Sequence, residues 1–165
     1  MDRDQVDEVL KDWAAERPDL DNGSLGIVLR LQILAKQFLE QVTAELSSLG
    51  LEWWEYDVLS ALRRQGEPYR MPATNLAEES RLSAGAMTHR IDRLENRKLV
   101  VRTNDGRDRR RVIVQLTRTG KTLIDRATEA RFAAAEQALE SLSTPEHKQL
   151  GNTLRKLLLS QEPAS

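Results

Sequence analysis

Residues 83–116 read SAGAMTHRIDRLENRKLVVRTNDGRDRRRVIVQL, and the first half of this stretch has helical periodicity. Ser83 belongs to the residue types that cap helix N-termini. After it, apolar residues recur three and four positions apart, at Met87, Ile91 and Leu94. This spacing predicts an amphipathic helix with these three side chains on its buried face.

The second half of the same stretch has the pattern of a β-hairpin. β-Branched residues dominate 99–103 and 112–116, and the Asp105-Gly106 pair between them favours a turn. Residues 72–83, just before the helix, predict a short helix and a tight turn. A helix-turn-helix followed directly by a hairpin is the winged variant of that motif. The predicted fold class is therefore mainly α, with a small β-hairpin wing.

Longer amphipathic helices are predicted on both sides of this winged module. Their apolar stripes have no cover within so small a module, so a second copy of the chain is expected to bury them. The segment 67–72 contains two prolines and is expected to be a loop. The other predicted helices have their apolar stripes within residues 6–14, 27–49, 51–66, 117–142 and 144–160.

The composition argues against several functional classes. The 165 residues include no Cys and only two His, so neither a thiolate nucleophile nor a zinc site of the usual spacing is expected. No apolar run is long enough to span a membrane, and the acidic start MDRDQVDEVL lacks the features of a signal peptide. A cytoplasmic protein without metal, cofactor or membrane partner is expected. Because the sequence has no acid/base constellation and no glycine-rich phosphate loop, enzymatic activity is not expected.

The charge of the chain is distributed unevenly. The whole chain has 25 basic and 26 acidic residues, but residues 81–111 contain ten basic and only four acidic residues. A basic module within an otherwise acidic chain favours a polyanionic partner such as double-stranded DNA.

Candidate DNA contacts lie on the predicted helix and in the predicted wing. The outer face of the helix would offer hydroxyl, imidazole and guanidinium groups to base edges or phosphates. A polar outer face is also normal for a solvated helix, so the arginine-rich hairpin, which can enter a minor groove, is the stronger indication. The predicted DNA-binding residues are Ser83, Thr88, His89 and Arg93 on the helix, and Arg107, Arg109 and Arg110 in the wing.

Two charged residues do not fit the apolar stripes. Asp57 and Arg90 both fall on the predicted inner faces of their helices, and an unpaired charge in a core is costly. One interpretation is a buried Asp57–Arg90 ion pair that fixes the two helices. The other is a polar ligand pocket beneath the DNA-binding helix, where a ligand that breaks the pair also moves this helix.

Residues 82–124, together with LGLEWWEYDVLSALRRQG at 49–66, resemble the MarR family of bacterial transcriptional regulators. The wing residues match the family's motif as Asp105-x-Arg107-Asp108-x-Arg110, with Gly106 in place of the common proline. The resemblance extends through the long flanking helices and so covers nearly the whole chain. It implies a homodimer joined by its N- and C-terminal helices. Such a dimer binds a pseudopalindromic operator, usually as a repressor released by a small ligand.

The N-terminal segment is similar to that of one branch of the family, the urate-responsive and PecS-type regulators, which have an additional first helix bearing a tryptophan. In that branch a Trp, an Asp and two Arg line the ligand site, and Trp13, Asp57, Arg90 and Arg102 occupy the matching positions. The resemblance implies a small anionic ligand such as urate or a related metabolite, which suits an indole beside guanidinium groups. Trp13 taken alone is equally consistent with simple packing in a dimer interface.

The sequence thus predicts a single MarR-type domain over residues 1–165 with three parts. Residues 1–49 would serve as ligand lid and in dimerisation, 50–116 as the winged helix-turn-helix, and 117–165 as C-terminal dimerisation helices. The predicted function is that of a homodimeric, sequence-specific DNA-binding transcriptional regulator, a repressor released by a small anionic ligand. The alternative is a winged-helix interaction module whose basic wing docks on an acidic protein partner.

Overall fold

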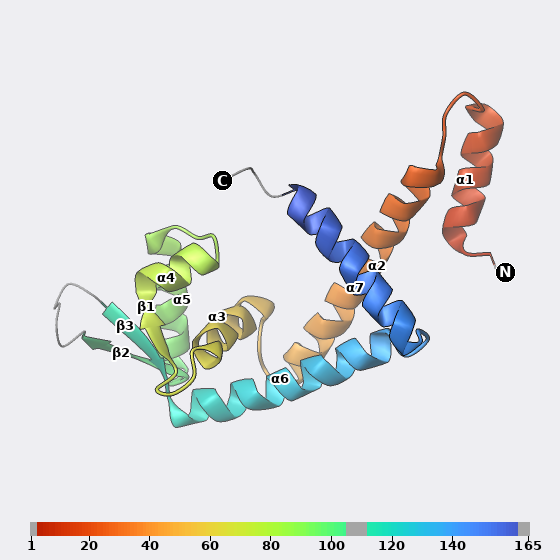
Figure 1. Cartoon of the computed structure of the whole chain (residues 1–165). Helices are drawn as coiled ribbons and strands as arrows, with labels where there is room; N and C mark the ends of the chain where they lie inside the picture. The colour runs from red at the N-terminus through yellow and green to blue at the C-terminus, as the bar shows by residue number, and fades with distance from the viewer. Residues whose placement is uncertain (1–2, 105–111, 162–165) are drawn as a thin grey trace. The chain divides into compact units, whose positions relative to one another are not determined.

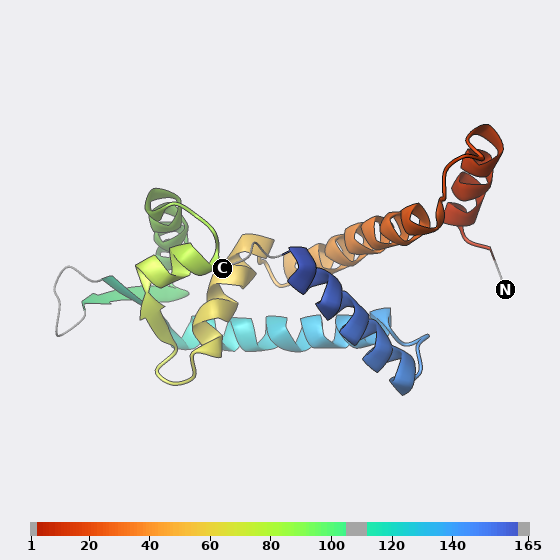
Figure 2. The ribbon, with the colours of Figure 1, turned by 45° about the horizontal axis from the view of Figure 1, so that its top comes forward.

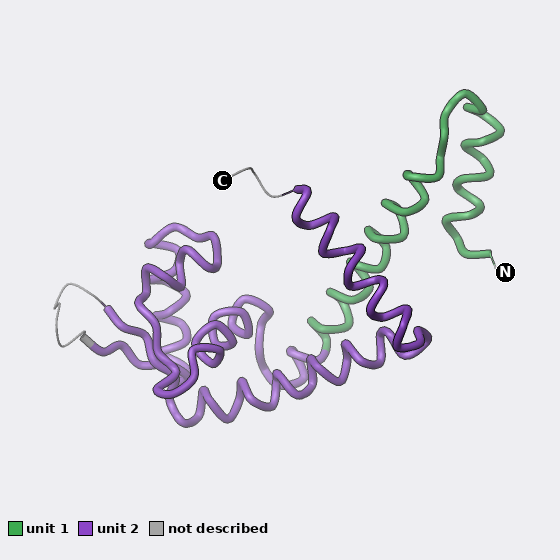
Figure 3. The backbone as a smooth tube through the Cα atoms, in the orientation of Figure 1, with its two compact units in different colours: residues 1–44 green, residues 45–165 purple. Residues whose placement is uncertain are grey.

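The computed structural model describes residues 3–104 and 112–161, which form seven helices and three strands (Figure 1). The chain divides into two compact units, residues 1–44 and residues 45–165 (Figure 3). Within the described parts of the chain, none of the helices has the length and apolar content that crossing a bilayer requires.

The first unit is a helical hairpin. Helix α1 (Gln5–Glu16) ends just before Arg17, as the sequence predicts, and α2 (Gly23–Ser48) follows a short link. The two helices approach closely at Gly26, because a Cβ atom there would lie 2.7 Å from a methyl carbon of Leu10. Glycine therefore allows the contact between the two helices.

One arginine of α2 fixes the N-terminus of α1. Asp4 caps α1 by accepting hydrogen bonds from the backbone N–H groups of Val6 and Asp7. Arg30 donates to the carboxylates of both Asp4 and Asp7, at 2.7 Å each. The hydrogen bond from Arg30 holds the pKa of Asp4 below its ordinary range. Ion pairs therefore add to the packing that holds this hairpin together.

The second unit contains the predicted winged helix-turn-helix and two further helices. Its elements are α3 (Trp53–Arg64), β1 (Arg70–Pro72), α4 (Ala73–Glu79), α5 (Ala84–Asn96), β2 (Val100–Asn104), β3 (Val112–Leu116), α6 (Arg118–Ala138) and α7 (Thr144–Gln161). Figure 2 shows the sheet beside the N-terminal end of α6, with α3 packed against the same helix. These bounds confirm the predicted helices and hairpin strands to within a few residues.

The sheet contains a third strand that the sequence does not predict. The strand order is β1-β3-β2 with antiparallel neighbours, and Met71 of β1 pairs with Val114 of β3. The expected loop over residues 67–72 is therefore confirmed for residues 67–69 and wrong for residues 70–72, which form β1. Pro72 is tolerated because β1 is a short edge strand. The pairing comes from β3, which is distant in sequence, so local residue pattern does not reveal it.

The apolar face of α5 lies in the core of the second unit. Met87, Ile91 and Leu94 are at most 1% exposed, which confirms the predicted buried face. Leu62 of α3 and Leu76 of α4 are fully buried as well. Since one side of α5 is fixed in the core, its polar side is left facing outward.

The end of the wing is joined to α6 by a close backbone contact. Thr117 caps α6 by accepting a hydrogen bond from the backbone N–H of Gly120 at 2.9 Å, and it donates to the carbonyl of Lys98 at 2.7 Å. A Cβ atom on Gly120 would lie only 2.0 Å from the carbonyl oxygen of Leu99. A glycine is therefore required where α6 crosses the start of β2.

The terminal helices expose apolar side chains. Helix α7 has no buried residue, and Leu157, Leu158 and Leu159 near its end are all exposed. In the first unit, Ile27 and Leu39 of α2 are exposed in the same way. The apolar stripes that the sequence predicts for these helices are therefore partly exposed, although Val42 and Leu46 at the C-terminal end of α2 are buried.

Candidate nucleic-acid interface

The N-terminal half of α5 presents polar side chains to solvent. Ser83 caps the helix by accepting a hydrogen bond from the backbone N–H of Ala86 at 3.2 Å. Thr88 and His89 are exposed, and Gly85 keeps this end of the helix slim. The structure thus places Ser83, Thr88 and His89 together on an exposed helix end. Such an end can enter the major groove of B-DNA and offer hydroxyl and imidazole groups to it.

Two ion pairs join the N-terminus of α3 to α5. The buried carboxylate of Glu55 accepts a hydrogen bond from Arg97 at 2.5 Å, and Arg97 also donates to the carbonyl of Gly50 at 2.8 Å. Closer to solvent, Glu52 pairs with Arg93 at 2.7 Å. Because these bonds are directional, they fix the orientation of α5 relative to α3.

The indole ring of Trp54 contacts two arginines of α5. The guanidinium carbons of Arg90 and Arg93 lie 5.4 and 4.6 Å from the ring centroid, which is within the range of cation–π attraction. The indole N–H donates to Glu52 at 2.6 Å, and this bond, together with that from Arg93, holds the pKa of Glu52 below its ordinary range. Arg93, a predicted DNA contact, is thus held against α3 while its side chain remains 48% exposed.

The structure does not form the predicted Asp57–Arg90 ion pair. Both residues are half-buried rather than buried, and the guanidinium of Arg90 lies over Trp54 instead. Within the described residues, the Asp57 carboxylate has neither a hydrogen bond nor an ion pair. The interpretation as a structural pair was therefore wrong, because Trp54 gives Arg90 a competing contact and both side chains reach solvent. The ligand pocket stays a prediction.

Arg102 of β2 contacts α5 at three positions. Its Nη2 donates to the Asp92 carboxylate at 2.5 Å and to the Thr88 carbonyl at 3.2 Å, and its Nη1 donates to Glu95 at 2.5 Å. The backbone N–H of Arg102 also donates to Glu95, at 3.0 Å. Arg102, which the sequence assigns to a ligand site with Asp57, therefore ties the first wing strand to α5.

The remaining predicted site residues lie elsewhere. Trp13 is on α1 in the first unit, and its side chain is 51% exposed. The predicted wing contacts Arg107, Arg109 and Arg110 lie outside the described residues.

Comparison with known proteins agrees with this architecture. Residues 49–111 match the MarR family. The chain is 32% identical over 149 residues to the HTH-type transcriptional regulator PecS of Dickeya dadantii (strain 3937), with 88% of each chain covered. The chain belongs to the MarR family.

Two further relatives of this MarR-family chain are informative. The HTH-type transcriptional repressor MdtR of Bacillus subtilis (strain 168) is 26% identical over 136 residues, which cover 82% of this chain and 86% of MdtR. A solved structure of a mutant MarR from E. coli complexed with operator DNA matches with a TM-score of 0.67 and 21% identity, covering 88% of this chain and 97% of that one. The structural match shows the winged fold. Since regulators of the MarR family bind DNA, this chain is a DNA-binding transcription regulator and not an enzyme.

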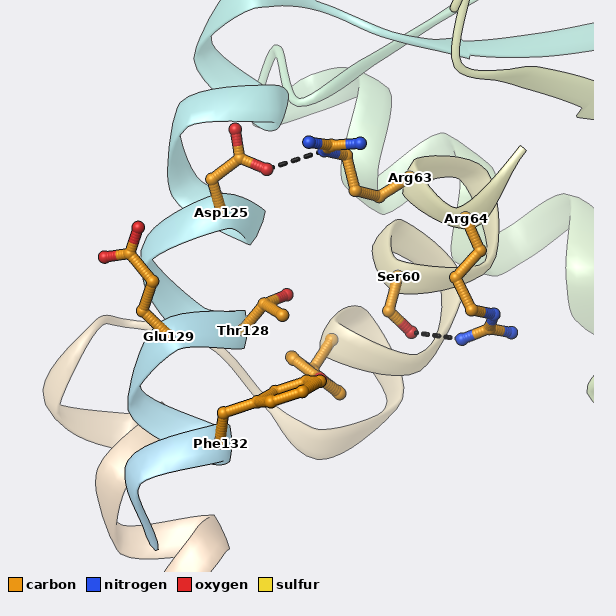
Figure 4. Close-up of a pocket in the computed structure, with 8 residues that line it drawn as sticks. Ser60, Arg63, Arg64, Asp125, Thr128, Glu129 and Phe132 are labelled. Atoms are coloured by element: carbon orange, nitrogen blue, oxygen red, sulfur yellow. Dashed lines mark hydrogen bonds and ion pairs between the residues drawn. The ribbon is translucent and has the colours of Figure 1, made fainter. Parts of the chain in front are cut away.

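The MarR-family chain also has an open groove of about 640 Å³ between α3 and α6 (Figure 4). Arg63 of α3 reaches across it to Asp125 of α6 at 2.6 Å, and Lys121 binds the same carboxylate at 2.7 Å. Arg64 donates to Ser60 at 3.1 Å. None of the predicted site residues lines this groove, and its central charges are already paired.

Sequence reasoning missed the acidic partners that hold α5 of this MarR-family regulator. Glu52 and Glu55 are three residues apart at the start of α3, and Arg93 and Arg97 are four residues apart at the C-terminal end of α5, where Arg97 is the C-cap. Residues three or four apart lie on the same side of a helix. Two acidic residues at this spacing on one helix and two basic residues at it on another could therefore have indicated the two ion pairs. Glu55 lies outside the apolar stripe that the sequence predicts for its helix, and it is buried by tertiary packing.

Proposed function

We propose that this MarR-family regulator is a homodimer that binds a pseudopalindromic operator and represses transcription. The observation that carries the proposal is the polar face of α5, which faces outward. Ion pairs with residues of α3 and β2 hold α5 in this orientation. The uncovered apolar side chains of α2 and α7 support a second copy as the partner. The relative MdtR, which is named a repressor, supports the direction of regulation.

The proposed contacts divide into two kinds. Side chains near the N-terminus of α5 read base edges in the major groove, and wing arginines bind phosphates or the adjacent minor groove. Arg93 can contact a base only if its guanidinium breaks its contacts with Glu52 and Trp54, or uses a donor that these contacts leave unoccupied. The proposed contact residues are Ser83, Thr88, His89, Arg93, Arg107, Arg109 and Arg110.

Selection of duplexes from a random-sequence pool by the full-length protein tests this function. The selected sequences are expected to be pseudopalindromes with half-sites centred about 10 base pairs apart, because two-fold symmetry places the two α5 helices in successive major grooves. Thr88→Ala should change the preference among sites, whereas Arg107→Ala should weaken binding to all sequences and reduce its salt dependence. Failure to enrich any duplex, with binding to an acidic protein instead, would contradict the proposal.

A small anionic ligand such as urate is the second part of the proposal. The candidate residues are Trp13, Asp57, Arg90 and Arg102. The Asp57 carboxylate without a described partner, and the Arg90 guanidinium stacked on an indole, support a polar site next to α5. A ligand lowers DNA affinity only by the difference between its affinities for the two conformations, so tenfold release needs about 1.4 kcal/mol of coupling.

Titration of urate and related purines into the protein–DNA complex tests the ligand. Release of the duplex, together with a change in tryptophan fluorescence, is the expected result. Trp13→Phe should weaken the response and leave DNA binding largely intact, with Trp53→Phe as the matched control because Trp53 is not among the candidate residues. Release that persists unchanged in Trp13→Phe would show that the ligand binds elsewhere.

A further inference from the structure

The two acidic residues of α5 share one arginine as a partner. Between Arg81 and Asn104 the sequence contains two carboxylates, Asp92 and Glu95, both on α5. Arg102 binds both of them, each at 2.5 Å. One arginine of the wing thus pairs every carboxylate in this part of the chain.

The position of Asp92 makes this pairing relevant to DNA. Asp92 lies four residues after Thr88 and three after His89, so the three side chains share one exposed face of α5. The side chain of Asp92 is 53% exposed, whereas that of Arg102 is 28% exposed. A free carboxylate on this face would repel the phosphates that the neighbouring groups are placed to approach.

The contacts of Arg102 are suited to holding two charges in place. Its two terminal nitrogens bind different carboxylates, and the Thr88 carbonyl fixes the guanidinium between them. Glu95 is held a second time by the backbone N–H of Arg102. A planar guanidinium has its donors on separate nitrogens and can bind two carboxylates from one fixed position, whereas an ammonium group has all three donors on one nitrogen and fits this geometry less well.

We propose that Arg102 is a charge mask for the DNA-facing helix: it pairs with Asp92 and Glu95 and offsets one of their two negative charges, so that α5 can approach the phosphate backbone. The proposal rests on the proposed placement of α5 against DNA. It gives Arg102 a role in the protein without ligand, as a positioning and neutralising residue that need not touch DNA.

The test is a double-mutant cycle on DNA affinity, with a labelled duplex that the wild-type protein has selected from a random pool. Arg102→Gln is expected to weaken binding about tenfold at low salt, and the loss should shrink as salt screens the freed carboxylates. The double variant Asp92→Asn/Glu95→Gln should bind at least as tightly as the wild type, because it also removes the negative charge that Arg102 leaves uncompensated. Adding Arg102→Gln to this double variant should cause little further loss, because no carboxylate remains to be masked. Arg102→Lys should fall between the wild type and Arg102→Gln.

Each alternative gives a different result. Equal losses from Arg102→Gln in both backgrounds would mean that Arg102 contacts DNA itself and would overturn the mask. A double variant as weak as Arg102→Gln would show a purely structural clamp and would also overturn it. Arg155→Gln, which removes a positive charge from exposed α7, is the control for net charge. If Thr88→Ala changes site preference while Arg102→Gln has no effect, the mask fails and the proposed interface stands.

Discussion

The carboxylate of Glu55 and the guanidinium of Arg97 lie 2.5 Å apart, although 42 residues separate them in the sequence. Glu55 is buried at the start of α3, and Arg97 follows the last residue of α5. Their contact holds α5 at its C-terminal end. The position of α5 therefore depends on the buried carboxylate of Glu55.

Glu55→Gln should lower the free energy of unfolding by about 2 kcal/mol, because it weakens a hydrogen-bonded pair in which one partner is buried. Glu52→Gln is the matched control, because Glu52 forms an exposed pair with Arg93 on the same two helices and its loss should cost clearly less than that of Glu55. Urea unfolding of both variants measures the difference. Equal losses would show that burial of Glu55 does not strengthen its pair.

Gly120→Ala should destabilise the protein by about 3 kcal/mol or more, because the added methyl group would meet the carbonyl oxygen of Leu99 at 2.0 Å. Gly151→Ala is the control, since a Cβ atom at this helical position of α7 meets no heavy atom within 4 Å. That change should be stabilising by about 0.5 to 1 kcal/mol. Thermal unfolding compares the two variants, and a harmless Gly120→Ala would contradict the close approach of α6 to the wing.

The stability that Asp125 contributes should depend on pH. Hydrogen bonds from Lys121 and Arg63 hold the pKa of its carboxyl below the ordinary range. A carboxyl with a lower pKa in the folded state stabilises the protein above its unfolded-state pKa, and this contribution is lost as pH falls through the folded-state pKa. Asp125→Asn should thus lower the free energy of unfolding at neutral pH, and the difference from the wild type should shrink as pH falls below the ordinary carboxyl pKa of 3.8.

Urea unfolding at several pH values checks this dependence. Asp12→Asn is the control, because Asp12 is exposed on α1 and has no described partner. It should leave stability unchanged throughout. A loss in Asp125→Asn that does not shrink in acid would mean that packing, and not charge, accounts for its effect.

Leu157→Glu should weaken self-association about tenfold or more, because it places a charge on the exposed apolar end of α7 that the proposed dimer buries. Ser160→Glu introduces the same charge on the same helix and serves as the control. Sedimentation velocity over a range of concentrations measures both. A wild-type chain that stays monomeric at micromolar concentration would refute the proposed dimer.

Several features could be predicted from local sequence alone. Met87, Ile91 and Leu94 identified the buried face of α5, because helical geometry brings residues three and four apart onto one side. The residues before Pro18 located the end of α1, since a proline disfavours helical conformation in the residue before it. The wing strands were recognised because β-branched runs flank a turn. In each case the deciding interaction lies within a few residues of the chain.

Only the tertiary structure decided which charges meet. Arg90 was expected to pair with Asp57 and instead lies over Trp54, while the buried pair is formed by Glu55 and Arg97. Strand β1 likewise needed β3 beside it. An ion pair between helices depends on the height and rotation at which they cross, and a shift of one residue turns a helical side chain by about 100°. The packing of the apolar faces sets this rotation of each helix. The sequence therefore determined that α5 has a polar face, and the packed core determined which residues of α3 and β2 form ion pairs with α5.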